Sequence, residues 1–385
     1  MRLPEGARFI IDRLAEHGFR GDIVGGCVRD HLLGKEPNDY DITTSATPEE
    51  MQRIFSDMRM IGTGLKHGTL TVMYEGEPYE VTTYRLDGEY TDNRHPDSVS
   101  FTRDLTLDLS RRDFTINAMC YNPTYDVTDL FGGREDLDSR LIRAVGEPEV
   151  RFTEDALRIL RALRFASVLD FSIDPATSRA IYKTAHLMKN VSRERILVEW
   201  TKLLTGVGAY RIINEYFDIL KSVIPGITLA RVPSAEAFMN EFPEVRELAL
   251  FSSAEEYAAA MRELKSDNGR RLRGEAVLSL LERGIDSEDD VARLLVDGGV
   301  PVAHYAVSLY RLLGFGDKSA TLASLLESDR SFALSTLAVN GDDIRSIGFV
   351  GRDIGRVLRK LLCATATGKV QNERAALLSL AEKMK

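Results

Sequence analysis

The stretch of residues 21–44, GDIVGGCVRDHLLGKEPNDYDITT, restricts the local fold more than any other part of the chain. Residues 22–24 are typical of the end of a short strand. Gly25 and Gly26 then let the backbone turn tightly and approach a ligand without side-chain obstruction. Residues 27–33 have helical character, so we expect the backbone N–H groups at the start of that helix to face an anion such as phosphate.

Two aspartates follow in the segment 38–42, NDYDI, which predicts a strand. Residues two apart point to the same face of a strand, so Asp39 and Asp41 should project together. Two such carboxylates repel unless a cation lies between them, and hard oxygen ligands suit Mg²⁺ held together with substrate phosphates. A bare D-x-D is equally consistent with a solvated strand end. The glycine pair, Arg29 and Asp30 a short distance upstream favour the metal site.

Composition indicates a globular chain of more than one unit. A chain of 385 residues is too long to fold around one ordinary hydrophobic core. Its contents of 44% apolar and 28% charged residues fit a soluble protein. No apolar run approaches the ~20 residues needed to span a bilayer, and the first residues lack a signal-peptide core. We therefore expect a cytoplasmic protein without a membrane partner. Cys27, Cys120 and Cys363 lack the spacing of disulfide or zinc frameworks, so free thiols are expected.

The net charge of −9 hides a local asymmetry. Residues 151–230 hold 12 Lys and Arg against 8 Asp and Glu, a local net charge of +4. A basic region directly after the aspartate segment is a place where a polyanion could bind. A solvated amphipathic helix face would give the same count, so both interpretations stay open.

Three local patterns predict further elements near the aspartates. Residues 5–18 have helical spacing and end at a glycine. Thr47 begins a capping box with proline at the first helical position, so a helix to about Phe55 should follow. Residues 68–74 and 79–85 are β-rich and joined by the turn-forming sequence EGEP, which predicts a hairpin.

The second strand of this hairpin carries Glu80, which should share a face with Thr82 and Tyr84. Glu80 is a candidate third catalytic carboxylate, and an ordinary exposed strand glutamate is the alternative. Residues 86–100 contain glycine, proline and many polar groups without periodicity, which is typical of a mobile loop. Such a loop inside a domain is functional or disordered.

Residues 110–119, SRRDFTINAM, combine two guanidinium groups with a carboxylate and an amide. Arg112 can bind phosphate through two parallel hydrogen bonds, while Asp113 or Asn117 can hold a ribose hydroxyl. An Arg–Asp surface pair is the alternative. Residues 129–133 should then turn the chain out of the sheet.

From Phe152 onward the sequence predicts helices. Asp155 and Arg158 are close enough on a helix to pair, with Arg161 on the next turn. A plain surface salt bridge is one interpretation; the other is that this acceptor and these donors read the Watson–Crick edge of a base. In the amphipathic helix of residues 192–204, Trp200 is better explained as a core anchor than as a stacking platform.

The remaining sequence predicts helices without repeats. Before a helix that carries Arg356, Arg359 and Lys360, the segment 348–355 has three glycines. Such glycines can approach a phosphate backbone, although close helix packing explains them equally well.

Five motifs together resemble the class II tRNA nucleotidyltransferases, the CCA-adding enzymes, which share a superfamily with bacterial poly(A) polymerases. They are GGCVRD, DYD, EVTTYR, RRDFTINAM and EDALRILRALRF, in the order and spacing of that family. The similarity covers residues 21–165 and again the chain from Asn340. It implies an α/β head with the nucleotidyltransferase fold, a small mixed sheet with helices, followed by an all-α neck, body and tail. We predict these parts at residues 1–138, 139–205, 206–330 and 331–385, with the tail binding tRNA.

The resemblance also implies roles for individual residues. Asp39 and Asp41 would be the Mg²⁺ ligands and catalytic residues. Gly26, Arg29 and Arg112 would hold the nucleotide, and Asp155 and Arg158 would select CTP and then ATP, with Arg161 and Arg164 alongside. The residues themselves add Glu80 as a catalytic candidate, and Gly25, Asp113 and Asn117 as nucleotide-binding candidates. The implied reaction is in-line attack of the tRNA 3′-hydroxyl on the α-phosphate of the nucleotide, with pyrophosphate leaving.

Features that separate the subtypes favour the full CCA-adding form. Residues 61–69, IGTGLKHGT, resemble that form, and the basic C-terminal extension of a poly(A) polymerase is absent. A loop at residues 85–90 is present, whereas CC-adding relatives lack its equivalent. The six histidines form no phosphohydrolase motif. An A-adding enzyme, a poly(A) polymerase, or a non-catalytic or hydrolytic RNA-binding protein remain alternatives, and both monomer and homodimer stay open.

Overall fold

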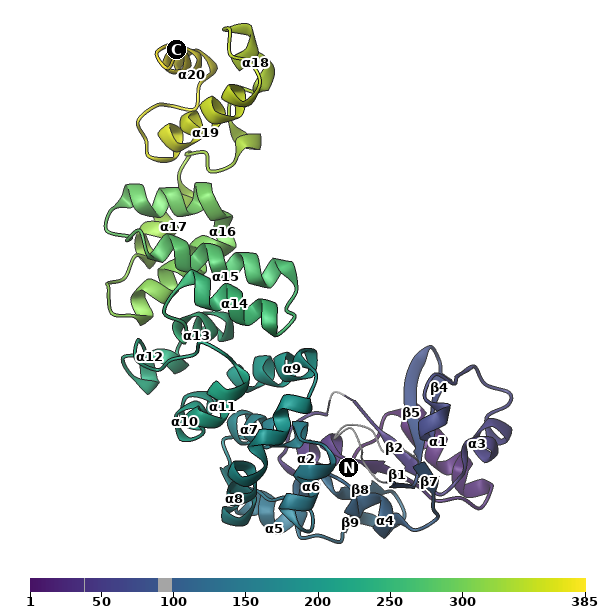
Figure 1. Cartoon of the computed structure of the whole chain (residues 1–385). Helices are drawn as coiled ribbons and strands as arrows, with labels where there is room; N and C mark the ends of the chain where they lie inside the picture. Colours follow the sequence, from purple (N-terminus) through teal and green to yellow (C-terminus); the bar gives the residue numbers. More distant parts are fainter. Residues whose placement is uncertain (38, 89–98) are drawn as a thin grey trace. The chain divides into compact units, whose positions relative to one another are not determined.

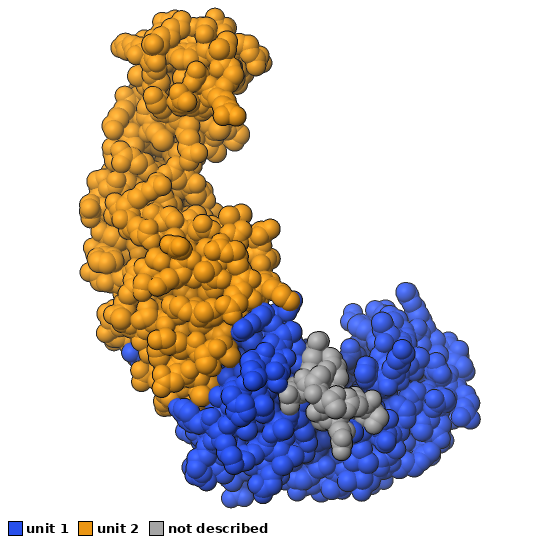
Figure 2. All heavy atoms as spheres, in the orientation of Figure 1, with its two compact units in different colours: residues 1–212 blue, residues 213–385 orange. Residues whose placement is uncertain are grey.

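The computed structural model describes residues 1–37, 39–88 and 99–385. The chain divides into two units, Met1–Ile212 and Ile213–Lys385, which Figure 2 colours blue and orange. Asn38 of the predicted strand and most of the predicted loop 86–100, including the end of the segment 85–90, lie outside the described residues. The division gives two units rather than four, so the boundaries at residues 138, 205 and 330 stay predictions.

The first unit is built on a mixed sheet, as predicted (Figure 1). In spatial order its strands are β3 (Met60–Ile61), β4 (Thr69–Tyr74), β5 (Glu77–Thr83), β2 (Ile42–Thr44), β1 (Gly21–Val24), β8 (Met119–Asn122) and β9 (Asp126–Asp129). β2 and β5 pair in parallel, and the other neighbours are antiparallel. Two short ladders join β6 (Arg85–Asp87) to β7 (Val99–Phe101) and β10 (Leu141–Ile142) to β11 (Ser172–Ile173).

One face of the sheet is apolar because its register aligns Ile23, Ile42 and Val81 across three strands. All three side chains are buried. Helix α1 (Glu5–Glu16) covers this face, and a side chain at Gly21 would collide with Leu14 of that helix. Burial of these apolar side chains provides the main driving force for forming this layer.

The opposite face carries polar side chains along the same strands. Asp22, Thr43 and Thr82 are aligned there by the register. Helix α4 (Leu105–Ser110) covers part of this face, where its Leu109 packs with Val24 of β1 and a cysteine of β8. Because side chains alternate along a strand, Glu80, two residues before Thr82 on β5, points to the same side as this row, and Asp41 precedes Thr43 by the same two residues.

Several locally predicted elements are confirmed. α1 ends beside the predicted glycine, and α3 (Pro48–Ile54) begins with the capping box at Thr47. β4 and β5 form the predicted hairpin, but its turn is only Glu75 and Gly76, both with positive φ, so β5 begins two residues earlier than expected. Asp129 ends β9 by accepting hydrogen bonds from backbone N–H groups of the following turn.

The predicted strand through both candidate catalytic aspartates is wrong. β2 begins only at Ile42, so Asp39 and Asp41 lie in the segment before the strand. One ladder bond extends beyond the strand, from the N–H of Val24 to the carbonyl of Asp41 at 3.0 Å. Gly34 to Pro37 form no regular element, and the chain enters the sheet only where an apolar residue can be buried.

The helix predicted over residues 154–165 is interrupted. α6 (Pro148–Glu154) ends at Asp155, whose extended backbone (φ −136°, ψ 102°) separates it from α7 (Leu157–Leu169). The short strand β11 also interrupts the helices expected from Phe152 onward. The first unit continues with α2 (Gly26–Leu32), α5 (Gly133–Asp138), α8 (Pro175–Thr184) and α9 (Arg193–Leu204), and with the 3₁₀ turns η1 (Leu65–His67), η2 (Thr115–Asn117) and η3 (Ala185–Asn190). α10 (Ala209–Glu215) crosses into the second unit.

Residues 174–385, all of them described, contain helices and loops but no strand. The second unit contains α11 (Phe217–Val223), α12 (Ala235–Met239), α13 (Pro243–Ala249), α14 (Ala254–Glu263), α15 (Asn268–Leu281), α16 (Glu288–Leu312), α17 (Ser319–Glu327), η4 (Leu334–Thr336), α18 (Gly341–Ser346), α19 (Arg352–Ala366) and α20 (Arg374–Glu382). Within the described residues, none of the helices combines the length and apolar character needed to cross a bilayer.

Candidate active site

Asp39, Asp41 and Glu80 line one cavity of about 610 Å³ in the first unit. The sheet explains how the last two meet: Ile42 of β2 is paired with Val81 of β5, and Asp41 and Glu80 each come one residue earlier. Burial and then repulsion by Glu80 raise the pKa of Asp41 above its ordinary value, and Asp39 adds to the rise. Three carboxylates thus share one electrostatic environment.

This donor set fits a hard divalent cation. Asp39 and Asp41 are accessible from the cavity, and a cation between them would relieve the repulsion that raises the pKa of Asp41. Over residues 1–37, 39–88 and 99–385, no three His, Cys, Asp or Glu side chains are arranged as a complete metal-ligand group. A cation would therefore need further ligands from substrate or water, and the role of Glu80 as a third ligand stays a prediction.

Two guanidinium groups flank the glycine turn that leads into α2. Gly25 has φ 83°, and a side chain there would have its Cβ 3.4 Å from Nη1 of Arg112. A Cβ on Gly26 would lie 3.4 Å from Nη2 of Arg29. The positive charge of Arg112 also opposes the rise in the pKa of Asp41. The turn thus brings two cationic donors close to an unobstructed backbone, beside the carboxylates, and this arrangement suits the phosphates of a nucleotide.

A buried polar chain connects this turn to α7. Arg29 donates from Nη1 to Oδ1 of Asn117 at 2.7 Å, and Asn117 donates from Nδ2 to Oδ1 of Asp113 at 3.2 Å. Arg161 donates to Oδ2 of Asp113 from Nε and Nη2 at 2.8 and 2.5 Å. Burial alone would raise the pKa of Asp113, but Arg161, together with Arg158 and Asn117, outweighs burial and lowers that pKa to about 2. Asp113 is therefore part of a buried network rather than of a surface pair.

Three of the predicted arginines surround one aromatic ring. The guanidinium carbons of Arg29, Arg161 and Arg164 lie 5.1, 5.4 and 3.8 Å from the ring centre of Phe165. Glu199 of α9 lies 2.7 Å from Nε of Arg164, and burial lowers the pKa of Arg164. Positive charge held this closely is stabilised by the ring face, and it is suited to attract an anionic ligand.

The predicted pair between Asp155 and Arg158 is not formed. Asp155 lies at the break between α6 and α7, where it accepts from the N–H of Leu157 at 3.0 Å and from Arg195 at 2.7 Å. Arg158 instead donates to Glu154 at 2.7 Å and to the carbonyl of Arg111 at 2.9 Å. Its second bond nevertheless joins α7 to the segment 110–119.

Sequence reasoning missed Asp108, Glu154 and Phe165. Asp108 is fully buried and accepts from Arg111 at 2.7 Å and from the hydroxyl of Thr43 at 3.1 Å, so it links the arginine pair to β2. Its position three residues before Arg111, at helical spacing, was a usable signal. Nothing in the sequence indicates that the ring of Phe165 would gather three arginines.

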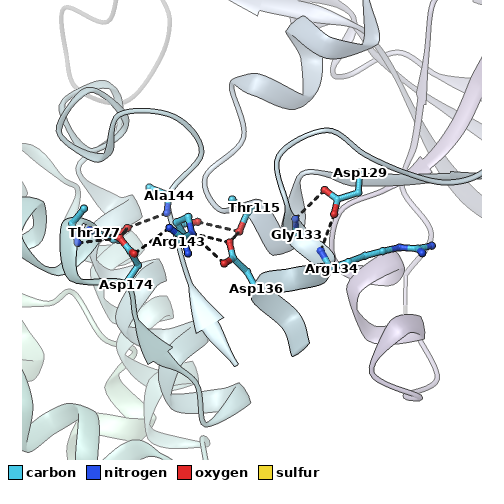
Figure 3. A network of polar contacts seen from close by, with 10 residues as sticks. Thr115, Asp129, Gly133, Arg134, Asp136, Arg143, Ala144, Asp174 and Thr177 are labelled. Atoms are coloured by element: carbon cyan, nitrogen blue, oxygen red, sulfur yellow. Dashed lines mark hydrogen bonds and ion pairs between the residues drawn. The ribbon is translucent and has the colours of Figure 1, made fainter. Parts of the chain in front are cut away.

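A second polar network supports the segment 113–117 from below (Figure 3). Arg143 donates from Nε to Asp136 of α5 at 3.1 Å and lies 3.3 Å from Asp174, which caps α8. Asp136 also accepts from the hydroxyl of Thr115 at 2.6 Å. Since Thr115 lies between Asp113 and Asn117, this network restrains the part of the chain that holds these two candidate nucleotide-binding residues.

Two family models match the chain. One, described as the poly A polymerase head domain, matches residues 22–143, which contain the sheet, the glycine turn and the carboxylates. The other, described as the probable RNA and SrmB-binding site of polymerase A, matches residues 170–230.

Curated relatives align over nearly the whole chain. The CCA-adding enzyme of Lactobacillus delbrueckii subsp. bulgaricus is 36% identical over 384 residues, covering 96% of this chain and 95% of the relative. That of Lactococcus lactis subsp. lactis is 35% identical and covers 100% and 99%. Among solved structures, the Bacillus stearothermophilus CCA-adding enzyme in complex with CTP has a TM-score of 0.84 at 33% identity, covering 100% of this chain and 98% of that chain. With this identity along its full length, the chain belongs to the CCA-adding enzymes, a family of tRNA nucleotidyltransferases.

Proposed function

We propose that this chain adds C, C and A in turn to the 3′ end of tRNA, using CTP and ATP and releasing pyrophosphate. One observation carries the proposal: the carboxylates Asp39 and Asp41 lie beside a glycine turn flanked by Arg29 and Arg112. The relatives that align over nearly their whole length are named CCA-adding enzymes, and this favours the full reaction over A-only or poly(A) addition.

The residues divide the chemistry between them. Arg29 and Arg112 bind the triphosphate against the backbone of Gly25 and Gly26 and orient its α-phosphate toward the cavity. The tRNA 3′-hydroxyl loses its proton to water as its oxygen forms a bond to the α-phosphorus, and the bond from that phosphorus to the oxygen bridging to the β-phosphate breaks, releasing pyrophosphate. The guanidinium groups stabilise the charge that develops on the phosphates.

Asp39 and Asp41 would hold Mg²⁺, with Glu80 adding negative charge nearby. When bound, the metal lowers the pKa of the attacking hydroxyl and neutralises the leaving pyrophosphate. Since both carboxylates face the substrate, their removal should affect every addition step alike.

Nucleotide choice belongs to the α6–α7 region in this proposal. Asp155 and Arg158 present an acceptor and donors to the base, while Arg161 and Arg164 support the site from the next turns. Glu154 and the carbonyl of Arg111 hold Arg158 in place. A cytoplasmic location completes the proposal, because tRNA is matured and used there.

Three tRNA transcripts test the function: one ending at the discriminator base, one at C and one at CC, each incubated with Mg²⁺ and CTP, ATP or both. The expected result is growth to CCA on each transcript, followed by a stop. Addition only to the CC-ended transcript, or an unlimited A tail, would contradict the proposal. Asp41→Ala should abolish transfer on every transcript, whereas Asp57→Ala, which removes an exposed carboxylate of the same unit, should not.

A further inference from the structure

A second cavity of about 410 Å³ adjoins the catalytic cavity. The two cavities share the lining residues Pro4 and Tyr40, the residue between Asp39 and Asp41, so they lie side by side. Arg2, His31 and Lys35 supply basic groups to the second cavity. Nothing in the reaction described above uses these three residues.

Helix α2 places the basic residues on the far side from the nucleotide turn. Arg29 of this helix faces the glycine turn, and His31, two residues later, lies roughly 200° further round the helix axis. After the helix, the N–H of Gly34 donates to the carbonyl of His31 at 2.9 Å and the N–H of Lys35 to that of Asp30 at 2.8 Å. This closing turn is typical of a helix C-terminus and directs the chain along the second cavity.

The basic side chains that line the second cavity outnumber the acidic ones. In the described part of the chain, the side chains of Arg2, His31 and Lys35 take part in no ion pair or hydrogen bond. Glu36 is the one acidic residue in the cavity lining. By contrast, Arg29 of the same helix is held by Asn117. Unpaired basic side chains around a cavity of this size are suited to a phosphate group.

We propose that this cavity binds the backbone phosphate on the 5′ side of the RNA's terminal nucleotide. The inference rests on the proposed function and adds a binding site for the RNA strand. The attacking 3′-hydroxyl must lie in the cavity of Asp39 and Asp41, and the phosphate in question is one sugar away from it. Because the catalytic cavity is lined by four carboxylates, that phosphate would be repelled there, whereas the adjoining cavity offers Arg2 and Lys35.

The double variant His31→Ala/Lys35→Ala tests the site. Its KM for tRNA ending in CC should rise about 10-fold, and the salt dependence of RNA binding should weaken by about 0.7 in log–log slope for the lost charge. Its KM for ATP should not change, because Arg29 and Arg112 are untouched. Arg53→Ala removes one exposed charge from α3, outside both cavities, and should leave the KM for tRNA unchanged.

Combining a modified primer with the double variant, as in a double-mutant cycle, shows whether the cavity contacts that phosphate. A primer whose last internucleotide linkage is a neutral methylphosphonate should bind about 10-fold more weakly to the unmodified protein but no more weakly to the double variant. Full loss in both proteins would overturn the proposal, and so would an unchanged KM for tRNA in the variant. This cycle separates a phosphate contact from a general loss of structure.

Pyrophosphate is the other phosphate source at this site, and inhibition by added pyrophosphate distinguishes it. The double variant should be inhibited as strongly as the unmodified protein. Weaker inhibition with an unchanged KM for tRNA would assign the cavity to the product and overturn the proposal. If the proposed function itself fails, the unmodified protein will add no nucleotide to any tRNA, which is a separate observation.

Discussion

Arg161 of α7 and Asp113, 48 residues earlier in the chain, are joined by two hydrogen bonds to a single carboxylate oxygen, at 2.8 and 2.5 Å. The other oxygen of Asp113 accepts from Asn117, which in turn holds Arg29 beside the glycine turn. A helix that follows the sheet is thereby connected to the glycine turn through three side-chain contacts. Changes at Asp113 should therefore affect both stability and nucleotide binding.

The first prediction concerns how stability depends on pH. The pKa of Asp113 is about 2 in the folded protein, below its ordinary value of 3.8. A carboxyl group whose pKa is lower in the folded than in the unfolded protein stabilises the fold at pH values above the unfolded pKa. This contribution is lost as the pH falls from about 4 toward 2. It amounts to about 2 kcal/mol. Urea unfolding of the protein and of Asp113→Asn between pH 6 and pH 2 measures it.

The difference in unfolding free energy between the two proteins should shrink as the pH falls. Asp57→Asn is a suitable control, because Asp57 pairs with Arg13 at a largely exposed position where charge pairs contribute little. A constant difference for Asp113→Asn across the whole pH range would mean that the charge of Asp113 does not stabilise the fold.

The second prediction concerns the glycine turn. Gly25→Ala places a side chain at φ 83°, where residues other than glycine are strained, and sets its Cβ against the guanidinium of Arg112. We expect kcat/KM for CTP to fall at least about 10-fold. Gly18→Ala has nearly the same φ, 82°, with no atom within 4 Å. Gly18→Ala should lower the stability of the protein but leave kcat/KM for CTP unchanged. An equal loss of kcat/KM in both variants would exclude a specific role for the glycine turn.

Local patterns predicted much of this fold. The glycine turn, the capping box of α3 and the β4–β5 hairpin each depend on residues within a few positions of one another, and each is present. The strand through Asp39 and Asp41 was wrong because alternation alone cannot show where pairing with a neighbouring strand begins. That point is set by the burial of Ile42 against the rest of the sheet.

Contacts between distant segments set the limit of sequence reasoning at the site. The spacing of Asp155 and Arg158 predicted that they pair with each other. The partner of each depends instead on which segments fold against α7: Asp155 pairs with Arg195, and Arg158 pairs with Glu154. The same holds for Arg29 and Asn117, which are 88 residues apart. The motifs identified the candidate residues, whereas the hydrogen-bond partner of each residue could not be predicted from them.

A third prediction concerns the core of the first unit. Trp200 is 1% exposed, as expected of a core anchor, and it is among the largest fully buried side chains. Trp200→Ala should lower the free energy of unfolding by about 3–5 kcal/mol, since it removes a large buried apolar surface and leaves a cavity. Val198→Ala, in the same helix but 50% exposed, should change it by less than about 0.5 kcal/mol. Thermal or urea unfolding measures both; a small effect of Trp200→Ala would show that the surroundings collapse into the cavity.

The last prediction concerns nucleotide choice. Glu154 accepts a hydrogen bond from Arg158 at 2.7 Å and also pairs with Arg151 at 2.5 Å, so it holds the guanidinium of Arg158 from one side. Arg158→Ala should loosen the choice between CTP and ATP while leaving some transfer, because the carboxylates and the phosphate-binding arginines remain. Glu154→Gln keeps the size of the side chain and removes its charge, so it should loosen the choice in the same direction by a smaller factor.

The measurement is the ratio of kcat/KM for CTP to that for ATP on tRNA ending at the discriminator base. Glu149→Gln is the matched control, because Glu149 lies on the same helix α6 and its partner, Lys183, lies outside the nucleotide site. An unchanged ratio in Arg158→Ala would contradict the role of Arg158 in selection. If Arg158→Ala lowers the ratio but Glu154→Gln does not, the carbonyl of Arg111 suffices to orient Arg158, and selection depends on the contact between α7 and the segment 110–119.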